Sequence, residues 1–197
     1  MTANGPQRPG LLASAPGQGA RAALPIVLGY LSIGFAAGVV QRASGLSVAE
    51  VMLMSMLLYA GSAQFVAAGL LAAAGPGPLT VATVATVVST VFLVNLRHVL
   101  LSAALAPHFS RFAAWKNALL GLQLTDETFV VAWSELLRGR VPDGGGRAAW
   151  MAGLNLSAYL SWAAANLAGA LASGLVGDTR ALGFDFALPA MFGALLV

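Results

Sequence analysis

The chain has 197 residues, of which 58% are hydrophobic and only 9% are charged. Soluble domains carry about 25% charged residues, so this chain has too little charge to cover a globular surface in water, which largely excludes soluble enzymes. Its ten basic residues are too sparse to track phosphates, so we expect no nucleic-acid partner, and the absence of cysteine excludes disulfides.

Three long stretches contain no Asp, Glu, Lys, Arg or His: residues 22–41, residues 51–96 and residues 148–177. A membrane-spanning helix needs about 20 mostly apolar residues, and each stretch reaches that length. Strands of a membrane barrel are about ten residues long and alternate in polarity, which these stretches do not. Backbone groups in lipid must be satisfied within the segment, so we predict an all-α integral membrane protein.

Residues 1–20 are rich in Gly, Pro, Ala and Ser, and we interpret them as a disordered N-terminal tail. Residues 21–197 then form one transmembrane domain with about five complete helices, the start of a sixth, and some helices broken or re-entrant. The sixth apolar segment reaches residue 197 without a closing loop, so we expect the natural polypeptide to continue. The predicted segments are Ala22–Val40, Val51–Ala74, Leu79–Ala106, Asn117–Leu137, Ala148–Val176 and one that begins near Ala181.

The fourth segment leaves the topology open. Arg111 and Lys116 follow the third segment, and Arg138, Arg140 and Arg147 follow the fourth. Basic loops favour the cytoplasmic side, so the two loops lie on opposite faces if the segment spans and on one face if it re-enters. Basic residues before the first segment weakly favour a cytoplasmic N-terminus.

Ionisable side chains inside a span are expensive and usually face a cavity or a partner. The third segment contains Asn95, Arg97 and His98, which either line an interior route or mark the membrane surface. The fourth contains Asp126 and Glu127 beside Thr125; we expect either carboxylate to pair with Arg97, as a structural ion pair or as a proton-carrying group.

In the fifth segment Asn155, Tyr159, Trp162 and Asn166 recur at helical spacing on one face. In lipid such a polar face turns inward, either to hold helices together or to line a solute path. The second segment contains a Gly-Ser-Ala-Gln cluster ending at Gln64, which favours either a helix break or close packing.

Gly34 and Gly38 in the first segment form a Gly-x-x-x-Gly pair that we interpret as a packing contact. No Ser-His-Asp set, metal-ligand spacing or phosphate-binding Gly loop is found. We therefore expect neither an enzyme nor a cofactor or metal.

With these motifs in order, the chain resembles the AzlC (YgaZ) family from about Leu24 to its end. The residues that carry the resemblance are Leu24-Pro25, Gly34-Phe35, Gly45-Leu46-Ser47, Tyr59 to Phe65, Asn95 to His98, Leu124 to Glu127 and Phe184 to Ala190. The resemblance implies a bacterial inner-membrane exporter of valine, leucine, isoleucine or analogues that works with a small membrane subunit of the AzlD or YgaH type.

Residue chemistry gives a mechanism for such a zwitterionic substrate. Arg97, or the start of a broken helix near Gln64, can bind the carboxylate, and Asp126 or Glu127 can bind the ammonium group or carry a coupling proton. The pocket-wall candidates are Phe65, Phe92, Tyr159 and Trp162, and further hydrogen bonds can come from Asn95, His98, Thr125, Asn155 and Asn166. Two alternatives remain open: a carrier or channel for another small polar solute, and a membrane assembly subunit that transports nothing.

Overall fold

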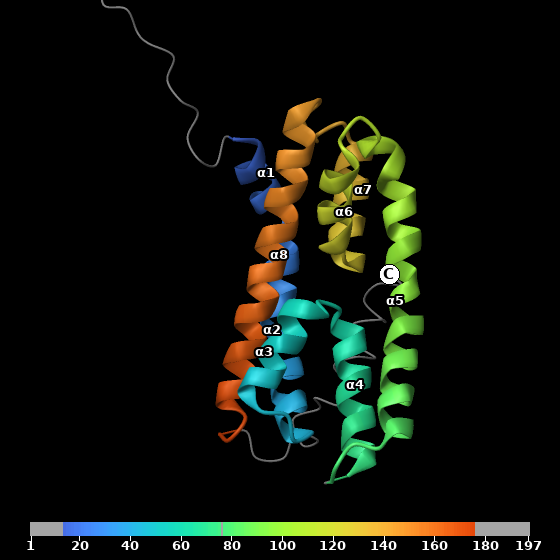
Figure 1. Cartoon of the computed structure of the whole chain (residues 1–197). Helices are drawn as coiled ribbons and strands as arrows, with labels where there is room; N and C mark the ends of the chain where they lie inside the picture. The colour runs from blue at the N-terminus through green and yellow to red at the C-terminus, as the bar shows by residue number, and fades with distance from the viewer. Residues whose placement is uncertain (1–13, 76, 176–197) are drawn as a thin grey trace, which may run out of the picture. The chain divides into compact units, whose positions relative to one another are not determined.

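The computed structural model describes residues 14–75 and 77–175, and every regular element in that part of the chain is an α-helix (Figure 1). The predicted helical class is therefore confirmed for these residues. The helices are α1 Ala15–Ala22, α2 Leu24–Ala43, α3 Val48–Leu57, α4 Gly61–Ala74, α5 Val81–Phe109, α6 Ala114–Leu122, α7 Asp126–Leu137 and α8 Gly145–Ala172.

Two helices, α2 and α5, are long and apolar enough to cross a membrane, and α3 and α4 are shorter apolar helices. The most apolar window of α5 contains no buried residue, and Val88, Phe92 and Leu100 on this helix are each more than 60% exposed. Water would make so much exposed apolar surface costly, whereas lipid would not. The predicted count of five spans and part of a sixth goes beyond these two helices and stays a prediction.

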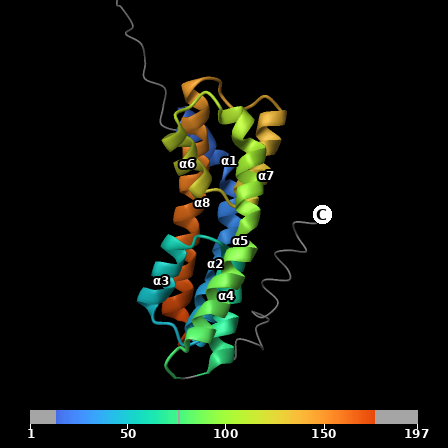
Figure 2. The ribbon, with the colours of Figure 1, turned by 45° about the vertical axis from the view of Figure 1, so that its right-hand side comes forward.

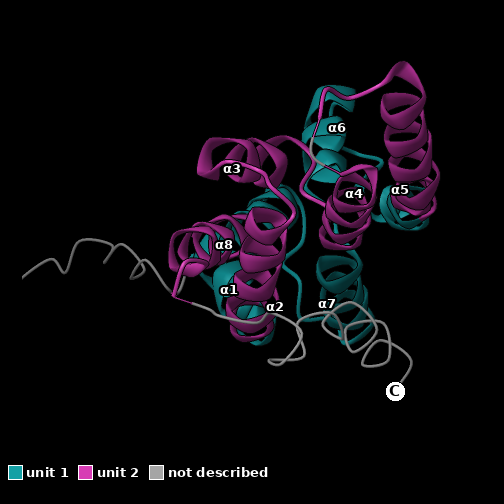
Figure 3. Ribbon diagram, turned by 90° about the horizontal axis from the view of Figure 1, so that it is seen from below, with its two compact units in different colours: residues 1–26, 101–158 teal, residues 27–100, 159–197 magenta. Residues whose placement is uncertain are grey.

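The chain divides into two compact units (Figure 3). Unit 1 comprises residues 1–26 and 101–158, and contains α1, α6, α7, the end of α5 and the first half of α8. Unit 2 comprises residues 27–100 and 159–197, and contains most of α2, all of α3 and α4, the first two thirds of α5 and the end of α8.

In unit 2, α2 and α8 pack closely because glycines remove the side chains between them. A Cβ atom on Gly38 would lie 2.2 Å from the carbonyl oxygen of Asn166, and one on Gly169 would lie 2.0 Å from that of Phe35. Gly34 faces the same helix, where a Cβ atom would lie 2.8 Å from Ala165 Cβ. The Gly-x-x-x-Gly pair is thus a packing contact, as predicted.

Helices α3 and α4 form a hairpin in unit 2. Ser47 starts α3 with a capping box, in which its Oγ accepts from the Glu50 N–H and its own N–H donates to the Glu50 carboxylate. Residues 58–60 interrupt the helix, and α4 then runs back beside α3 toward the end where α3 began (Figures 1 and 2). The second predicted segment is therefore two short helices, with the break where the Gly-Ser-Ala-Gln cluster favoured one.

Helices α6 and α7 form a second hairpin, in unit 1. The predicted segment Asn117–Leu137, which the sequence left open as a span or a re-entrant segment, consists of two short helices separated by residues 123–125, and α6 already begins at Ala114. Arg147 Nη1 donates to the carbonyl oxygen of His108 at 3.0 Å, so the chain before α6 and the chain after α7 meet. The basic loops on the two sides of the hairpin therefore lie at one end of unit 1.

Part of the predicted tail over residues 1–20 is helical. Ser14 Oγ accepts a hydrogen bond from a backbone N–H of the first turn of α1 and so starts the helix. A Cβ atom on Gly19 would lie 1.9 Å from the Trp150 carbonyl oxygen, and one on Gly153 would lie 2.1 Å from the backbone of α1. The small residues of this segment, which we interpreted as a sign of disorder, instead let α1 and α8 approach closely.

The remaining boundaries differ at helix ends. The third segment was predicted to end at Ala106, but α5 continues through Pro107 to Phe109, with the proline in its last turn. The fifth begins at Gly145 rather than Ala148. The predicted sixth segment near Ala181 and the first part of the predicted tail lie outside the described residues.

Candidate functional site

The strongest candidate site lies in unit 2, at the break between α3 and α4. Tyr59 adopts a φ of 38°, a left-handed conformation that is unfavourable for a bulky side chain, and Ala60 is extended. Strained residues of this kind cluster at functional sites. Because Ala60 has no side-chain acceptor, it cannot cap the N–H groups that begin α4.

A cation stands at this uncapped helix start. Arg97, on α5, donates a hydrogen bond from Nη2 to Oγ of Ser62, which is in the first turn of α4 and only 2% exposed. The positive end of the α4 dipole and the guanidinium group therefore act together. A partly buried place that combines helix N–H groups with an arginine favours a carboxylate or another anion.

Three fully buried amide side chains meet behind the start of α4. Gln41 of α2 donates from Nε2 to Asn166 Oδ1 of α8 at 2.9 Å and, in a longer contact, to Gln64 Oε1 of α4 at 3.4 Å. All three side chains are 0% exposed. Burying amides is costly unless they are hydrogen-bonded, so this cluster fixes the three helices in one register.

Trp162 of α8 covers the first residue of α4. Its Nε1 donates to Gln64 Oε1 at 3.3 Å, and a Cβ atom on Gly61 would lie 2.8 Å from the indole ring. Tyr30 of α2 packs edge-on against the indole, with ring centroids 4.9 Å apart. The glycine of the Gly-Ser-Ala-Gln cluster is thus the residue that makes room for the indole.

Side chains also satisfy the last carbonyl groups of α3. Gln64 Nε2 donates to the Met54 oxygen at 3.1 Å, and the Tyr159 hydroxyl donates to the Met56 oxygen at 3.0 Å. The rings of Tyr59 and Tyr159 also pack edge to face, with centroids 4.8 Å apart. The break is therefore held open by specific partners on α4 and α8.

The second break, in unit 1, has a different chemistry. Thr125 caps α7: its Oγ1 accepts from the Thr128 N–H, and its own N–H donates to Thr128 Oγ1 at 2.8 Å. Asp126 and Glu127 form the first turn of α7, where the helix dipole favours negative charge. Asn155 of α8 is fully buried and donates from Nδ2 to the Leu120 carbonyl oxygen at 3.1 Å.

The structure brings several predicted residues together at the first break. Gln64, Trp162 and Asn166 join one hydrogen-bonded cluster, while Phe65 is 8% exposed and Tyr159 supports the break. Asp126, Glu127, Thr125 and Asn155 belong to unit 1, whereas Arg97 belongs to unit 2, so the pairing of Arg97 with a carboxylate stays a prediction.

Other predicted residues lie away from this cluster or were missed. Phe92 is 63% exposed, and His98 Nδ1 lies 3.1 Å from the Asn95 backbone oxygen in the same helix. Gln41 was missed because it lies beside Arg42, where the predicted span ends. The sequence did contain a signal for Gln41: it is a polar residue at the end of an uncharged stretch that also contains the packing glycines Gly34 and Gly38.

No group of three or more His, Cys, Asp or Glu that could hold a metal ion occurs in residues 14–75 and 77–175. The polar groups at the first break are amides, hydroxyls and one guanidinium. Such groups can bind a small organic ion by hydrogen bonds, and they offer a transition metal few suitable ligands.

Comparison with known proteins adds a family. A model described as AzlC protein matches residues 25–176. The chain is 33% identical to the inner membrane protein YgaZ of Escherichia coli, over 91% of this chain and 71% of that protein. It is 29% identical to the branched-chain amino acid transport protein AzlC of Bacillus subtilis, over 86% of this chain and 61% of that protein. No solved structure matches the chain.

Proposed function

Because this chain belongs to the AzlC family, we propose that it exports branched-chain amino acids across the bacterial cytoplasmic membrane. The proposal includes a multi-pass arrangement, coupling to protons and a small membrane subunit of the AzlD or YgaH type. The name of the Bacillus subtilis relative supports the substrate class, and the name of the Escherichia coli relative supports the location.

One observation carries the proposal: Arg97 contacts Ser62 at the uncapped start of α4. Every exported amino acid carries a carboxylate, and this place offers helix N–H groups, a hydroxyl and a guanidinium group. We assign the substrate carboxylate to it. The buried amides of Gln64 and Asn166, together with the Trp162 indole, form a rigid support that keeps the start of α4 in place.

Asp126 and Glu127 supply the negative charge that a zwitterionic substrate or a coupling proton requires. Both lie in the first turn of α7, and negative charge is favoured at that end of a helix. In this proposal one of them binds the ammonium group or releases a proton during the cycle, as intramembrane carboxylates do in other carriers.

The test replaces Arg97 in cells that lack their own branched-chain exporter and express the full-length protein with its small subunit. The cells are loaded with valine, leucine and isoleucine through dipeptides, and the intracellular amino acids are followed over time. We expect Arg97→Gln to lower export by about tenfold or more, because a hydrogen bond to a charged group contributes about 1.5–3 kcal/mol, and Arg97→Lys to retain part of it.

Arg138→Gln is the matched control, because Arg138 is an exposed arginine that pairs only at the surface with Glu135. This control should export normally. Equal export by wild type and Arg97→Gln, at equal amounts in the membrane, contradicts the carboxylate site. If cells that express the wild-type protein accumulate the amino acids as much as cells without it, the substrate class is contradicted. Flux of another solute would then indicate a different carrier.

A further inference from the structure

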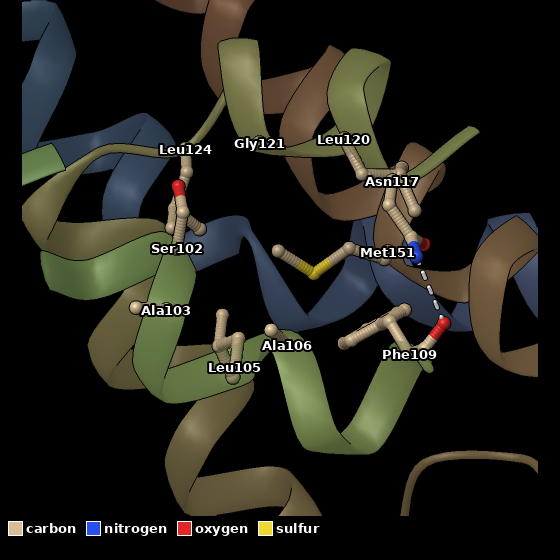
Figure 4. Close-up of a pocket in the computed structure, with 10 residues that line it drawn as sticks. All are labelled: Ser102, Ala103, Leu105, Ala106, Phe109, Asn117, Leu120, Gly121, Leu124 and Met151. Carbon is tan, nitrogen blue, oxygen red and sulfur yellow. Dashed lines mark hydrogen bonds between the residues drawn. The ribbon is translucent and has the colours of Figure 1, made fainter. Parts of the chain in front are cut away.

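Unit 1 contains a cavity of about 290 Å³ beside the break between α6 and α7 (Figure 4). Its walls come from the last turns of α5, from α6, from Leu124 in the break and from Met151 of α8. Discontinuous helices are where membrane carriers commonly place their substrates, so a cavity at this break is a candidate site.

The lining of the cavity is hydrocarbon on most sides. Figure 4 shows Leu105, Phe109, Leu124 and Met151 around one space, and no lining residue is charged. An enclosed apolar cavity of about 150 Å³ binds benzene, and this partly open cavity is nearly twice as large, so it has room for a branched aliphatic group. The chemistry of the walls selects hydrocarbon over a polar or charged side chain.

One polar group of the lining has an unused acceptor. Asn117 of α6 donates from Nδ2 to the Phe109 carbonyl oxygen at 3.1 Å, as the dashed line in Figure 4 shows. Its Oδ1 is buried and has no hydrogen-bond partner among the described residues. A buried acceptor without a donor costs about 1–3 kcal/mol, and a ligand that brings an N–H group would recover this energy.

Asn155 repeats this pattern next to the lining. Its Nδ2 donates to the backbone oxygen of Leu120, a lining residue, while its own Oδ1 is buried and lacks a partner in the described part of unit 1. Two amide oxygens without donors thus accompany one apolar cavity. The matching ligand combines a compact hydrocarbon group with an N–H donor.

We propose that this cavity holds the exported amino acid at a second position on its route, separate from the carboxylate site at α4, with the branched side chain against Leu105, Leu124 and Met151 and the ammonium group donating to Asn117 Oδ1. The inference rests on the proposed function and adds the site that selects the side chain. A lipid acyl chain fits the walls equally well, but it brings no donor for Asn117, so the amino acid is the better occupant.

The first test makes the cavity smaller. Ala106 lines it and Ala104 does not, although both are exposed alanines on the same turn of α5, so Ala106→Leu and Ala104→Leu form a matched pair. Export of leucine, isoleucine and valine is measured in the same dipeptide-loaded cells. Ala106→Leu should lower leucine export relative to valine by about tenfold, because one methylene changes discrimination by about 10–200-fold. Ala104→Leu should keep the wild-type ratio.

A second variant makes the cavity larger and keeps the test valid if Ala106→Leu fails to reach the membrane. Leu124→Ala removes a wall, so phenylalanine export should rise relative to leucine export. Selectivity that is unchanged in these variants, while wild type exports leucine, overturns the cavity proposal and leaves the proposed function standing. Absence of branched-chain export by wild type overturns both.

The hydrogen bond to the ammonium group is tested by binding. The full-length protein with its subunit, in lipid nanodiscs, is titrated with L-leucine and with isocaproate, which has the same hydrocarbon group but no amino group. Wild type should prefer leucine, and Asn117→Leu should reduce that preference by about tenfold. An unchanged preference in Asn117→Leu removes Asn117 from the site. If wild type binds isocaproate as tightly as leucine, the site does not recognise the ammonium group and the proposed orientation of the amino acid is overturned.

Discussion

Gln64 shows how much one side chain does in this fold. Its Nε2 donates to the last turn of α3, and its Oε1 accepts from Gln41 of α2 and from Trp162 of α8. A residue of α4 therefore connects three other helices while its own side chain is fully buried. An amide is suited to this position because it donates and accepts at the same time, without a charge that would be costly in lipid.

Replacing Gln64 by leucine should therefore be strongly destabilising. The indole N–H of Trp162 would lose its partner and the carbonyl of Met54 would keep only the Leu58 N–H, so we expect a loss of about 1–3 kcal/mol, seen as a lower midpoint of thermal unfolding in detergent. Ser89→Ala serves as the control, because Ser89 is exposed and bonds only within its own helix. Equal midpoints for both variants would show that the cluster does not stabilise unit 2.

At the scale of elements, glycine decides which helices pack and which stay apart. On α2, a Cβ atom at Gly38 would lie 2.2 Å from the Asn166 oxygen of α8, whereas one at Gly29 meets nothing within 4 Å. The obstacle at Gly38 is backbone, which cannot rotate away as a side chain would. Gly29 and Gly38, two of the three glycines of α2, thus have opposite roles.

The pair Gly38→Ala and Gly29→Ala should separate these roles. We expect Gly38→Ala to cost about 3 kcal/mol or more by forcing α2 and α8 apart. Gly29→Ala should stabilise the protein slightly, by up to about 1 kcal/mol, because alanine favours a helix. Thermal unfolding of the two variants gives the comparison, and a neutral Gly38→Ala would mean that the helices are not in close contact.

The sequence indicated the first break, as one of two alternatives, more clearly than the second, for a physical reason. Gly61 lacks a side chain and Ser62 is small, so the chain beside Tyr59 carries a visible break signal. Residues 123–125 contain neither Gly nor Pro, and α6 and α7 are interrupted there by an extended Thr125 that caps the next helix. The amphipathic stripe of α8 was visible at helical spacing, but its partner Gln41 lies on another helix 125 residues away from Asn166, a contact that spacing cannot reveal.

At the scale of the whole molecule, each unit contains one hairpin of two short helices. Chain order attaches them at opposite ends of α5: α4 leads into its start, and α6 follows its end. With 29 residues, α5 is about 43 Å long, more than the ~30 Å hydrocarbon core of a bilayer.

Because the 197-residue sequence contains no cysteine, single cysteines introduced into it can test this topology directly. We expect Ser110→Cys and Asp143→Cys, which flank the α6–α7 hairpin, to react with a membrane-impermeant maleimide from the same side of sealed vesicles. Labelling of positions 110 and 143 from opposite sides would mean that the hairpin crosses the bilayer.

The position of Trp162 has a practical consequence. The emission of an indole depends on the polarity and charges around it, and this ring covers Gly61 at the proposed carboxylate site while its N–H is bonded to Gln64. A negatively charged molecule arriving there changes the electric field across the ring. Trp162 is one of only four tryptophans in the chain. Binding at the carboxylate site should therefore shift the wavelength of the tryptophan fluorescence, without any attached dye.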